Sequence, residues 1–133
     1  MLIPKAKFIR DKKHLAFIRS LGCLTEFDHH NIFSNNPTVR QNEIMLSQII
    51  DPAHQRLRNV CGVGLTPSDE NLLPLCRVCH TLQHKEGEEE FFRPYLGYKR
   101  ANTLNKALYA VTGDRDKAME LIAEWKNEIL DIQ

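Results

Sequence analysis

The stretch LCRVCHTLQH, residues 75–84, decides the fold of this chain because it holds overlapping ligand patterns. Cys76 and Cys79 have the Cys-x-x-Cys spacing of half a zinc site. His80 and His84 are four residues apart, so on a helix both imidazoles lie on one face and can share a cation. The five residues that begin at Cys76 also have the spacing of a c-type haem attachment site. These interpretations predict different functions.

Length and composition indicate one globular domain. The 133 residues include 42% hydrophobic and 26% charged side chains, enough to bury a modest core without disulfides. No run is long enough to span a membrane, and residues 1–8 are too short and too charged for a secretory signal. We therefore expect a cytoplasmic protein with no membrane partner, whose cysteines stay reduced and bind metal more often than they pair. Haem attachment is disfavoured, because it normally follows export.

The positive charge is concentrated at the N-terminus. Residues 1–20 carry six Lys or Arg and one Asp, although the net charge of the chain is only +1. A basic segment can follow a phosphate backbone, so Lys12 and Lys13 are candidate nucleic-acid contacts. A solvated helix face is at least as compatible with this composition.

Caps and periodicity predict the elements of the first half of the chain. Residues 11–21 are typical of a helix that Asp11 can cap and Gly22 ends. Residues 23–42 are punctuated by Asn and Pro and are expected to be irregular. Residues 43–50 are apolar and partly β-branched, which indicates a strand.

The middle of the chain predicts a strand followed by helices. After a loop with Gly and Pro over residues 58–70, residues 71–76 indicate a second strand, in which Pro74 needs an edge or unpaired position. A helix is expected from residue 76 or 77 to residue 86, and another short one over residues 88–92.

The C-terminal third is expected to be helical. Residues 101–111 form one helix, and Asp114 caps a final helix. One face of that helix carries an apolar stripe that should pack on the core: Ala118, Ile122, Trp125 and Ile129. We therefore expect an α+β fold in a single domain, residues 1–133. Its parts are a basic N-terminal helix (1–22), a metal-binding core (23–92) and a helical extension (93–133).

The histidine pair belongs to a longer pattern. A strand ending at His54, a loop, Asn71, a second strand and the helix with His80 and His84 follow the order of a ββα-metal unit, which closes over one divalent ion.

These residues resemble the His-Asn-His, or HNH, endonucleases. NLLPLCRVCHTLQH (71–84) matches that family's Asn-Leu-x-x-Leu-Cys-x-x-Cys-His run, and DPAHQR (51–56) matches its first-histidine strand. More narrowly, three segments are similar to a phage- and prophage-associated HNH family: IRSLGC (18–23), residues 62–92, and LYAVTGDRDKAMELI (108–122). The resemblance covers most of the chain and implies an endonuclease that hydrolyses phosphodiester bonds, with DNA as the expected partner.

The reaction assigns a role to each residue of the pattern. Hydrolysis needs a base that works near neutral pH, which suits His54. A divalent ion on His80 and His84, expected to be Mg²⁺, Mn²⁺ or Zn²⁺, would stabilise charge on the phosphate and the leaving oxygen. By resemblance, Asn71 would keep His54 oriented. Arg56 could grip the scissile phosphate through two hydrogen bonds. Further phosphate contacts are expected from Arg58 and Arg77, together with Lys12 and Lys13.

One position departs from the family. HNH sites commonly carry a metal-binding Asp or His directly before the base histidine, where this chain has Ala53. Asp51, across the kink at Pro52, is the expected third ligand. The departure also motivates an alternative function, a zinc-stabilised nucleic-acid-binding module without cleavage.

The thiols predict a structural zinc. Cys76 and Cys79 would fasten the helix to the preceding strand, and zinc needs two further ligands. Related sequences carry Cys-x-x-Cys after the first helix, which implies Cys23 as the third ligand. For the fourth ligand we expect His30. The alternatives are His29, Glu26 and Cys61.

A rival assignment takes Asp28 and His29 as the acid–histidine pair of the active site. His29 stands 42 residues before Asn71, too far for a compact connection between two strands. We therefore prefer His54 as the base.

Overall fold

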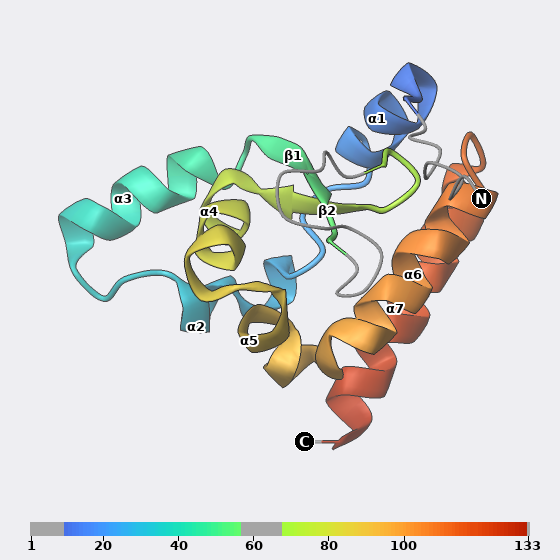
Figure 1. The fold of residues 1–133 in the computed structure, drawn as a ribbon. Coiled ribbons are helices and arrows are strands. Elements are labelled where there is room, and N and C mark those ends of the chain that lie inside the picture. Colours follow the sequence, from blue (N-terminus) through green and yellow to red (C-terminus); the bar gives the residue numbers. More distant parts are fainter. Residues whose placement is uncertain (1–9, 57–67, 133) are drawn as a thin grey trace, which may run out of the picture.

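The computed structural model describes residues 10–56 and 68–132. The fold is mixed α+β, mostly helical, with one antiparallel pair of strands (Figure 1). The elements are α1 (Lys12–Arg19), η1 (Glu26–Asp28), α2 (His29–Ile32), α3 (Pro37–Leu46), β1 (Ile50–His54), β2 (Leu72–Cys76), α4 (Arg77–Glu86), α5 (Glu88–Phe92), η2 (Arg93–Tyr95), α6 (Gly97–Ala110) and α7 (Arg115–Ile132). Within the described residues, no helix is both long and apolar enough to cross a bilayer.

The two strands pair in a register that accommodates two prolines. Pro52 lies opposite Pro74, and the ladder continues outward through Arg77 N–H to Ile49 O (2.8 Å) and Gln55 N–H to Asn71 O (2.7 Å). Because antiparallel hydrogen bonds recur at every second residue, the proline pair occupies a position where no ladder bond is made. The prediction that Pro74 needs an unpaired position is therefore confirmed.

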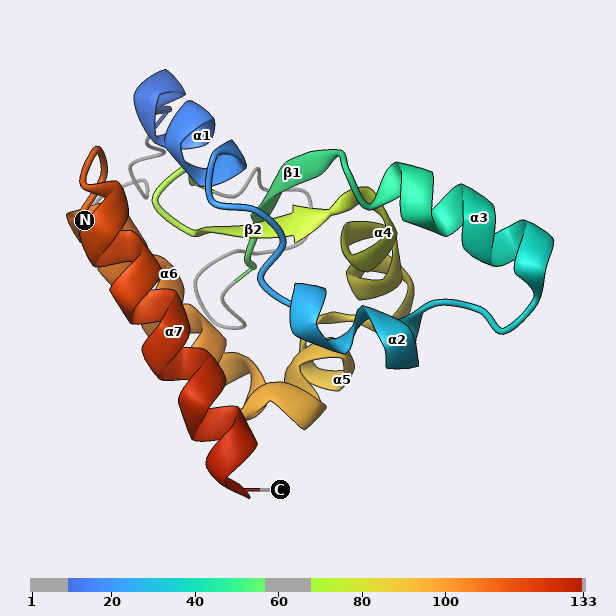
Figure 2. The same ribbon diagram turned by 180° about the vertical axis from the view of Figure 1, so that it is seen from behind.

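The sheet lies at the centre of the described fold. All five residues of β2 are buried, and α1 and α4 both contact the two strands. Helices α6 and α7 run antiparallel to each other along one side of the molecule, and α3 extends away on the opposite side (Figures 1 and 2). One cluster of buried side chains connects these parts, and it includes Ile18, Leu75, Phe92, Leu104 and Trp125.

Three helices, α1, α4 and α7, have the caps that the sequence predicts, whereas α6 begins at Gly97, four residues before the predicted start. The Asp11 carboxylate accepts from His14 N–H (3.0 Å) at the start of α1, and α4 ends at Gly87, whose φ of 89° favours glycine. Asp114 accepts from Lys117 N–H (3.2 Å) at the start of α7. The stripe of α7 predicted to face the core is buried: Ala118, Ile122, Trp125 and Ile129.

The strand predicted over residues 43–50 is wrong. Asn36 accepts from the N–H groups of Thr38 and Val39 (3.0 and 3.2 Å), and Pro37 sits in the first turn, where its missing N–H costs nothing. Helix α3 therefore runs through Leu46, and β1 begins only at Ile50. A short apolar run fits either element by periodicity alone. Residues 23–42, expected to be irregular, contain η1, α2 and the start of α3.

Trp125 is the largest fully buried side chain of the described residues. We expect Trp125→Ala to lower the free energy of unfolding by about 3–5 kcal/mol, because the cavity left behind adds to the lost burial. Leu130→Ala on the same helix is the control, since Leu130 is 49% exposed and its truncation should cost less than about 1 kcal/mol. Urea unfolding at a fixed zinc concentration measures both, and equal losses would contradict the packing described here.

Candidate functional site

Four residues far apart in the sequence bring their ligand atoms together. The ligand atoms of Cys23, His29, Cys76 and Cys79 all lie within 4.8 Å of one another. His29 Nε2 is 3.6 Å from Cys76 Sγ and 3.5 Å from Cys79 Sγ. Zn–S and Zn–N bonds of ordinary length around a tetrahedral ion place sulfur and nitrogen about 3.6 Å apart. The cluster therefore has the donor set and the spacing to hold a structural zinc ion.

The local structure explains how these ligands converge. Cys76 ends β2 and caps α4, where its sulfur accepts from Cys79 N–H (3.5 Å). Cys23 follows the turn after α1, and His29 begins α2. The buried hydroxyl of Thr25 donates to Cys79 Sγ (3.1 Å) and lies 3.6 Å from Cys23 Sγ. A zinc ion here would fasten the segment between α1 and α2 to the β2–α4 turn.

The ionisable ligands of the cluster shift one another's pKa values. Hydrogen bonds from Cys76 and Cys79 strongly lower the pKa of Cys23, and the same interactions, with burial, raise the pKa of Cys79. Burial by itself would lower the pKa of His29, but hydrogen bonds with Cys23 and Cys76 raise it to about 9. Cys23 thus has thiolate character, the form that binds zinc, whereas Cys79 and His29 would release their protons when a metal binds.

The fourth member of the cluster is His29 and not His30, so the structure favours the alternative histidine as the candidate ligand. The His29 ring stacks on Phe33, with centroids 4.5 Å apart, and this contact directs it toward the thiols. His30, one residue further along the short helix, is exposed. Glu26 is exposed as well and is not part of the cluster. Cys61, the remaining alternative, lies outside the described residues.

A second group of polar side chains joins β1 to α4. His80 Nε2 and His84 Nε2 are 3.0 Å apart, close to the roughly 3.3 Å expected for two nitrogens on one tetrahedral ion. Burial, with the charges of His80 and Arg56, lowers the pKa of His84 and favours the neutral imidazole that binds metals. The pair therefore presents two ligand atoms on one face of α4.

Asp51 contacts the other nitrogen of His80, which differs from its predicted role. Its carboxylate lies 3.1 Å from His80 Nδ1 and accepts two bonds from Arg77, at 3.0 and 3.1 Å. Burial would raise the pKa of Asp51, but the hydrogen bonds from Arg77 and His80 outweigh it and lower the pKa. Within the described residues, Asp51 does not complete a three-ligand group with His80 and His84. Asp51 is therefore positioned to orient the candidate metal ligand His80, as carboxylates next to metal-binding histidines do.

His54 is held by a residue that the sequence reasoning missed. Asp69 Oδ1 lies 2.8 Å from His54 Nε2, and Asp69 Oδ2 accepts from Asp11 N–H (2.9 Å). Burial would raise the pKa of Asp69, but the bonds from His54 and Asp11 outweigh it and lower the pKa. Asp69 thus ties the candidate base to the first turn of α1.

Asn71 forms main-chain hydrogen bonds near His54. Its carbonyl accepts from Gln55 N–H (2.7 Å), and its N–H donates to Ser68 O (3.1 Å). These bonds hold the end of β1 against the start of β2. Among the described residues, Asp69 supplies a side-chain contact to His54, and the bracing role of the Asn71 side chain stays a prediction.

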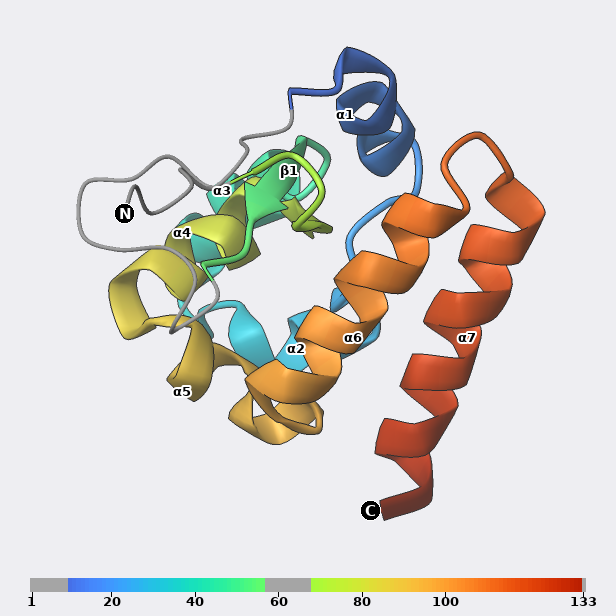
Figure 3. The ribbon, with the colours of Figure 1, turned by 45° about the vertical axis from the view of Figure 1, so that its right-hand side comes forward.

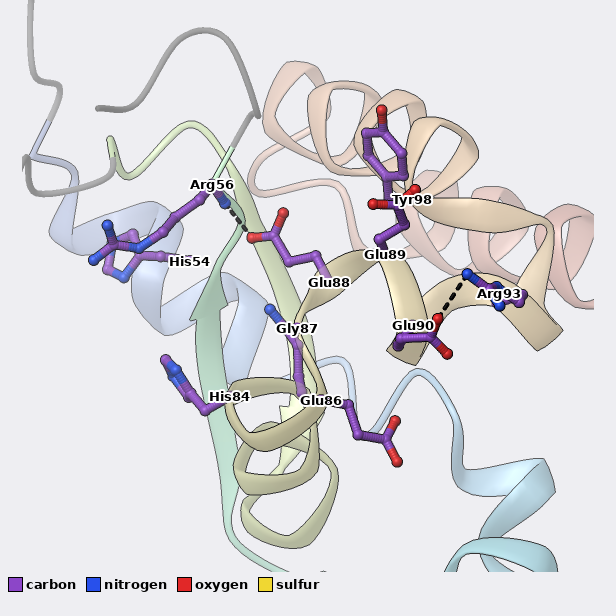
Figure 4. A pocket seen from close by; sticks show the side chains of 11 residues that line it. His54, Arg56, His84, Glu86, Gly87, Glu88, Glu89, Glu90, Arg93 and Tyr98 are labelled. Carbon is purple, nitrogen blue, oxygen red and sulfur yellow. Dashed lines mark hydrogen bonds and ion pairs between the residues drawn. The ribbon is translucent and has the colours of Figure 1, made fainter. Parts of the chain in front are cut away.

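A cavity of about 630 Å³ lies beside the histidines. His54, Arg56, His84 and Glu88 line it, together with other residues of α4, α5 and α6 (Figure 4). Glu88 accepts a hydrogen bond from Arg56 N–H, and burial raises the pKa of its carboxyl. His54 and His84, from different elements, thus face one shared space.

The predicted phosphate contacts are distributed unevenly. Lys12 and Lys13 are exposed on α1, and Arg56 is exposed at the cavity. The Arg77 guanidinium, in contrast, is bound to Asp51. Arg58 lies outside the described residues.

Comparison with known proteins identifies no similar protein. No family model, no curated protein and no solved structure matches the chain.

The zinc cluster predicts different effects for two adjacent histidines. We expect wild-type protein to keep about one zinc per chain through dialysis, and His29→Ala to lose most of it, since a structural site needs four ligands. His30→Ala is the matched control and should retain the metal. Inductively coupled plasma mass spectrometry after dialysis measures the zinc content per chain. Equal retention by the two variants would remove His29 from the site.

The Asp69 contacts predict a pH-dependent contribution to stability. Because the folded-state pKa of Asp69 is lowered, its stabilisation is present above the unfolded-state pKa and is lost as the pH falls through the folded value. We expect Asp69→Asn to cost about 1–3 kcal/mol at pH 7, with the difference from wild type shrinking below about pH 4. Asp131→Asn, at an exposed position, is the control. Urea unfolding across this pH range measures the free energy of unfolding of each protein. A difference between Asp69→Asn and wild type that does not change with pH would contradict the role given to Asp69.

Proposed function

We propose that the protein is a metal-dependent endonuclease of the HNH type that hydrolyses DNA phosphodiester bonds. One observation carries the proposal: His54 from β1 and His84 from α4 line the same cavity, and His84 is paired with His80. A candidate base and one member of a candidate metal-binding pair thus face one space, which would receive the phosphate. The pair of strands followed by α4 has the order expected of a ββα-metal unit.

His54 would serve as the general base. When its Nε2–H donates to the Asp69 carboxylate, Nδ1 carries the lone pair that can accept a proton from water. A buried carboxylate that fixes the tautomer of a catalytic histidine acts in the same way in hydrolytic triads. The water oxygen attacks phosphorus as its proton passes to His54. The bond from phosphorus to the leaving oxygen then breaks, and the leaving oxygen takes up a proton from solvent.

His80 and His84 would hold the divalent ion. The ion supplies charge stabilisation for the phosphate and the leaving oxygen. Two imidazoles are fewer protein ligands than a structural site uses, so an ion held by them would keep positions open for water and substrate oxygens. Asp51 contributes by fixing the His80 ring so that Nε2 is directed toward the ion.

The substrate would be guided by positive charge on one side of the site. Lys12 and Lys13 lie exposed on α1, whose first turn is tied to His54 through Asp69. Arg56 lies at the cavity two residues after His54. Cations at these positions can neutralise successive phosphates of one strand.

A second candidate function is a zinc-stabilised nucleic-acid-binding module without cleavage. Two observations favour it. Ala53 is fully buried at the position where HNH sites commonly carry a ligand, and the nearby Asp51 carboxylate is bound by Arg77. In this alternative the Cys3His cluster is the centre that matters, and the histidine pair has no catalytic role.

Cleavage assays with supercoiled plasmid separate these functions. We expect nicking by wild type in Mg²⁺ or Mn²⁺, and a loss of at least about 100-fold in His54→Ala, since a positioned base contributes roughly 10²–10⁴-fold. His30→Ala, an exposed histidine outside the cavity, should cut like wild type.

Two outcomes would count against the proposal. Nicking that is unchanged in His54→Ala would reject that residue as the base. Wild type that binds plasmid but never cuts it, with either metal, would favour the binding module.

A further inference from the structure

The cavity beside the histidines is larger than a phosphate requires. Its volume of about 630 Å³ falls within the roughly 300–1,000 Å³ typical of sites for whole small molecules. His54 and His84 lie on one side of it, and α5 with the start of α6 forms the other side (Figure 4). The reacting phosphate group would occupy the histidine side and leave the remaining space to another part of the substrate.

The charge of the opposite wall disfavours a second phosphate. Four glutamates line the cavity, Glu86, Glu88, Glu89 and Glu90, and they outnumber its two arginines, Arg56 and Arg93, of which Arg93 is paired with Glu90 at 2.6 Å. An anion placed against this wall would meet like charge at close range. The part of a nucleic acid that fits here is therefore its uncharged part, the base with its sugar.

The same wall offers the groups that recognise a base. The carboxylate of Glu88 is half-buried and held in place by Arg56 N–H, and a carboxylate only accepts hydrogen bonds. Carboxylates in nucleic-acid sites accept from exocyclic amino groups such as the N4 of cytosine. Tyr98 supplies an aromatic ring across the cavity from His84 (Figure 4), and unpaired bases stack on such rings. Gln83, which also lines the cavity, is buried and hydrogen-bonded to Gln55, so its side chain is held in place.

We propose that this cavity binds one unpaired nucleobase that carries an amino group, next to the phosphate that is cut. The inference rests on the proposed nuclease function and names its substrate as single-stranded or locally unpaired nucleic acid. A paired base uses its amino edge within the duplex and cannot enter, so the base must be free or flipped out.

Oligonucleotides that differ at one position test the inference. The probes are oligothymidylate single strands with one central deoxycytidine, the same strand with an abasic site there, and the deoxycytidine strand annealed to its complement. We expect wild type in Mn²⁺ to cut beside the deoxycytidine about tenfold faster than beside the abasic site, and the duplex to be cut more slowly still.

Matched variants assign the preference to the cavity wall. Glu88→Gln keeps the shape and an acceptor for Arg56 N–H but removes the charge, and it should reduce the preference for deoxycytidine by about tenfold. Glu124→Gln, at an exposed position on α7, is the control and should keep the wild-type preference. Urea unfolding of both variants checks that they remain folded.

The outcomes distinguish this inference from the nuclease proposal. Equal cutting of the deoxycytidine and abasic strands by wild type, with loss of cutting in His54→Ala, overturns the base site and leaves the nuclease intact. Wild type that cuts no strand overturns the nuclease. Fluorescence anisotropy with the same strands then still decides the base site, because equal affinity for the deoxycytidine and abasic strands overturns it.

Discussion

The convergence of three thiols and one imidazole is the constraint on which the rest of the structure depends. Cys23 and His29 come from the segment after α1, whereas Cys76 and Cys79 flank the junction between β2 and α4. The same segment is also tied to the junction by hydrogen bonds from Leu24 N–H to Pro74 O (2.8 Å) and from Thr25 to Cys79 (3.1 Å). A metal ion shared by both segments would set the position of α4 relative to the sheet. The orientation of the histidines on α4 follows from that position.

Helix α4 serves two sites because of its own geometry. Successive residues on an α-helix are rotated by about 100°, so His80 is turned away from Cys79 while His84 returns to the face of His80. The thiol side of the helix meets the α1–α2 segment, and the imidazole side meets β1 and the cavity. One stretch of helix thus carries both a thiol of the cluster and the histidine pair. The packing of α6 beside α7, visible in Figure 3, and the burial of Trp125 support this arrangement from outside the site.

Two aspartates give the histidines their orientation. Asp51 contacts His80 from within β1, and Asp69 contacts His54 from the turn before β2. Each carboxylate is partly removed from water and has its pKa lowered by the groups it binds, so each remains charged near neutral pH. A charged acceptor fixes which ring nitrogen carries the proton. The glutamates of α5 line the same cavity as His54 and His84, so the cavity has an acidic wall opposite its histidines.

Local sequence determined the elements and the kinds of ligand. The caps at Asp11 and Gly87 and the stripe ending at Ile129 predicted α1, α4 and α7, because capping and burial periodicity act within a few turns of one helix. The thiol pair and the histidine pair were visible for the same reason, since both spacings are short. Residues 43–50 were misassigned because an apolar run of that length fits a helix or a strand.

Only the tertiary structure decided which distant residues meet. It selected His29 over its neighbour His30, placed Asp51 behind His80, brought Asp69 to His54 and formed the wall that carries Glu88. None of these contacts has a signature in sequence spacing, because each depends on how α1, the sheet and α4 pack together in space. Sequence patterns report periodicity within an element, whereas the meeting of side chains from different elements is set by packing of the whole chain.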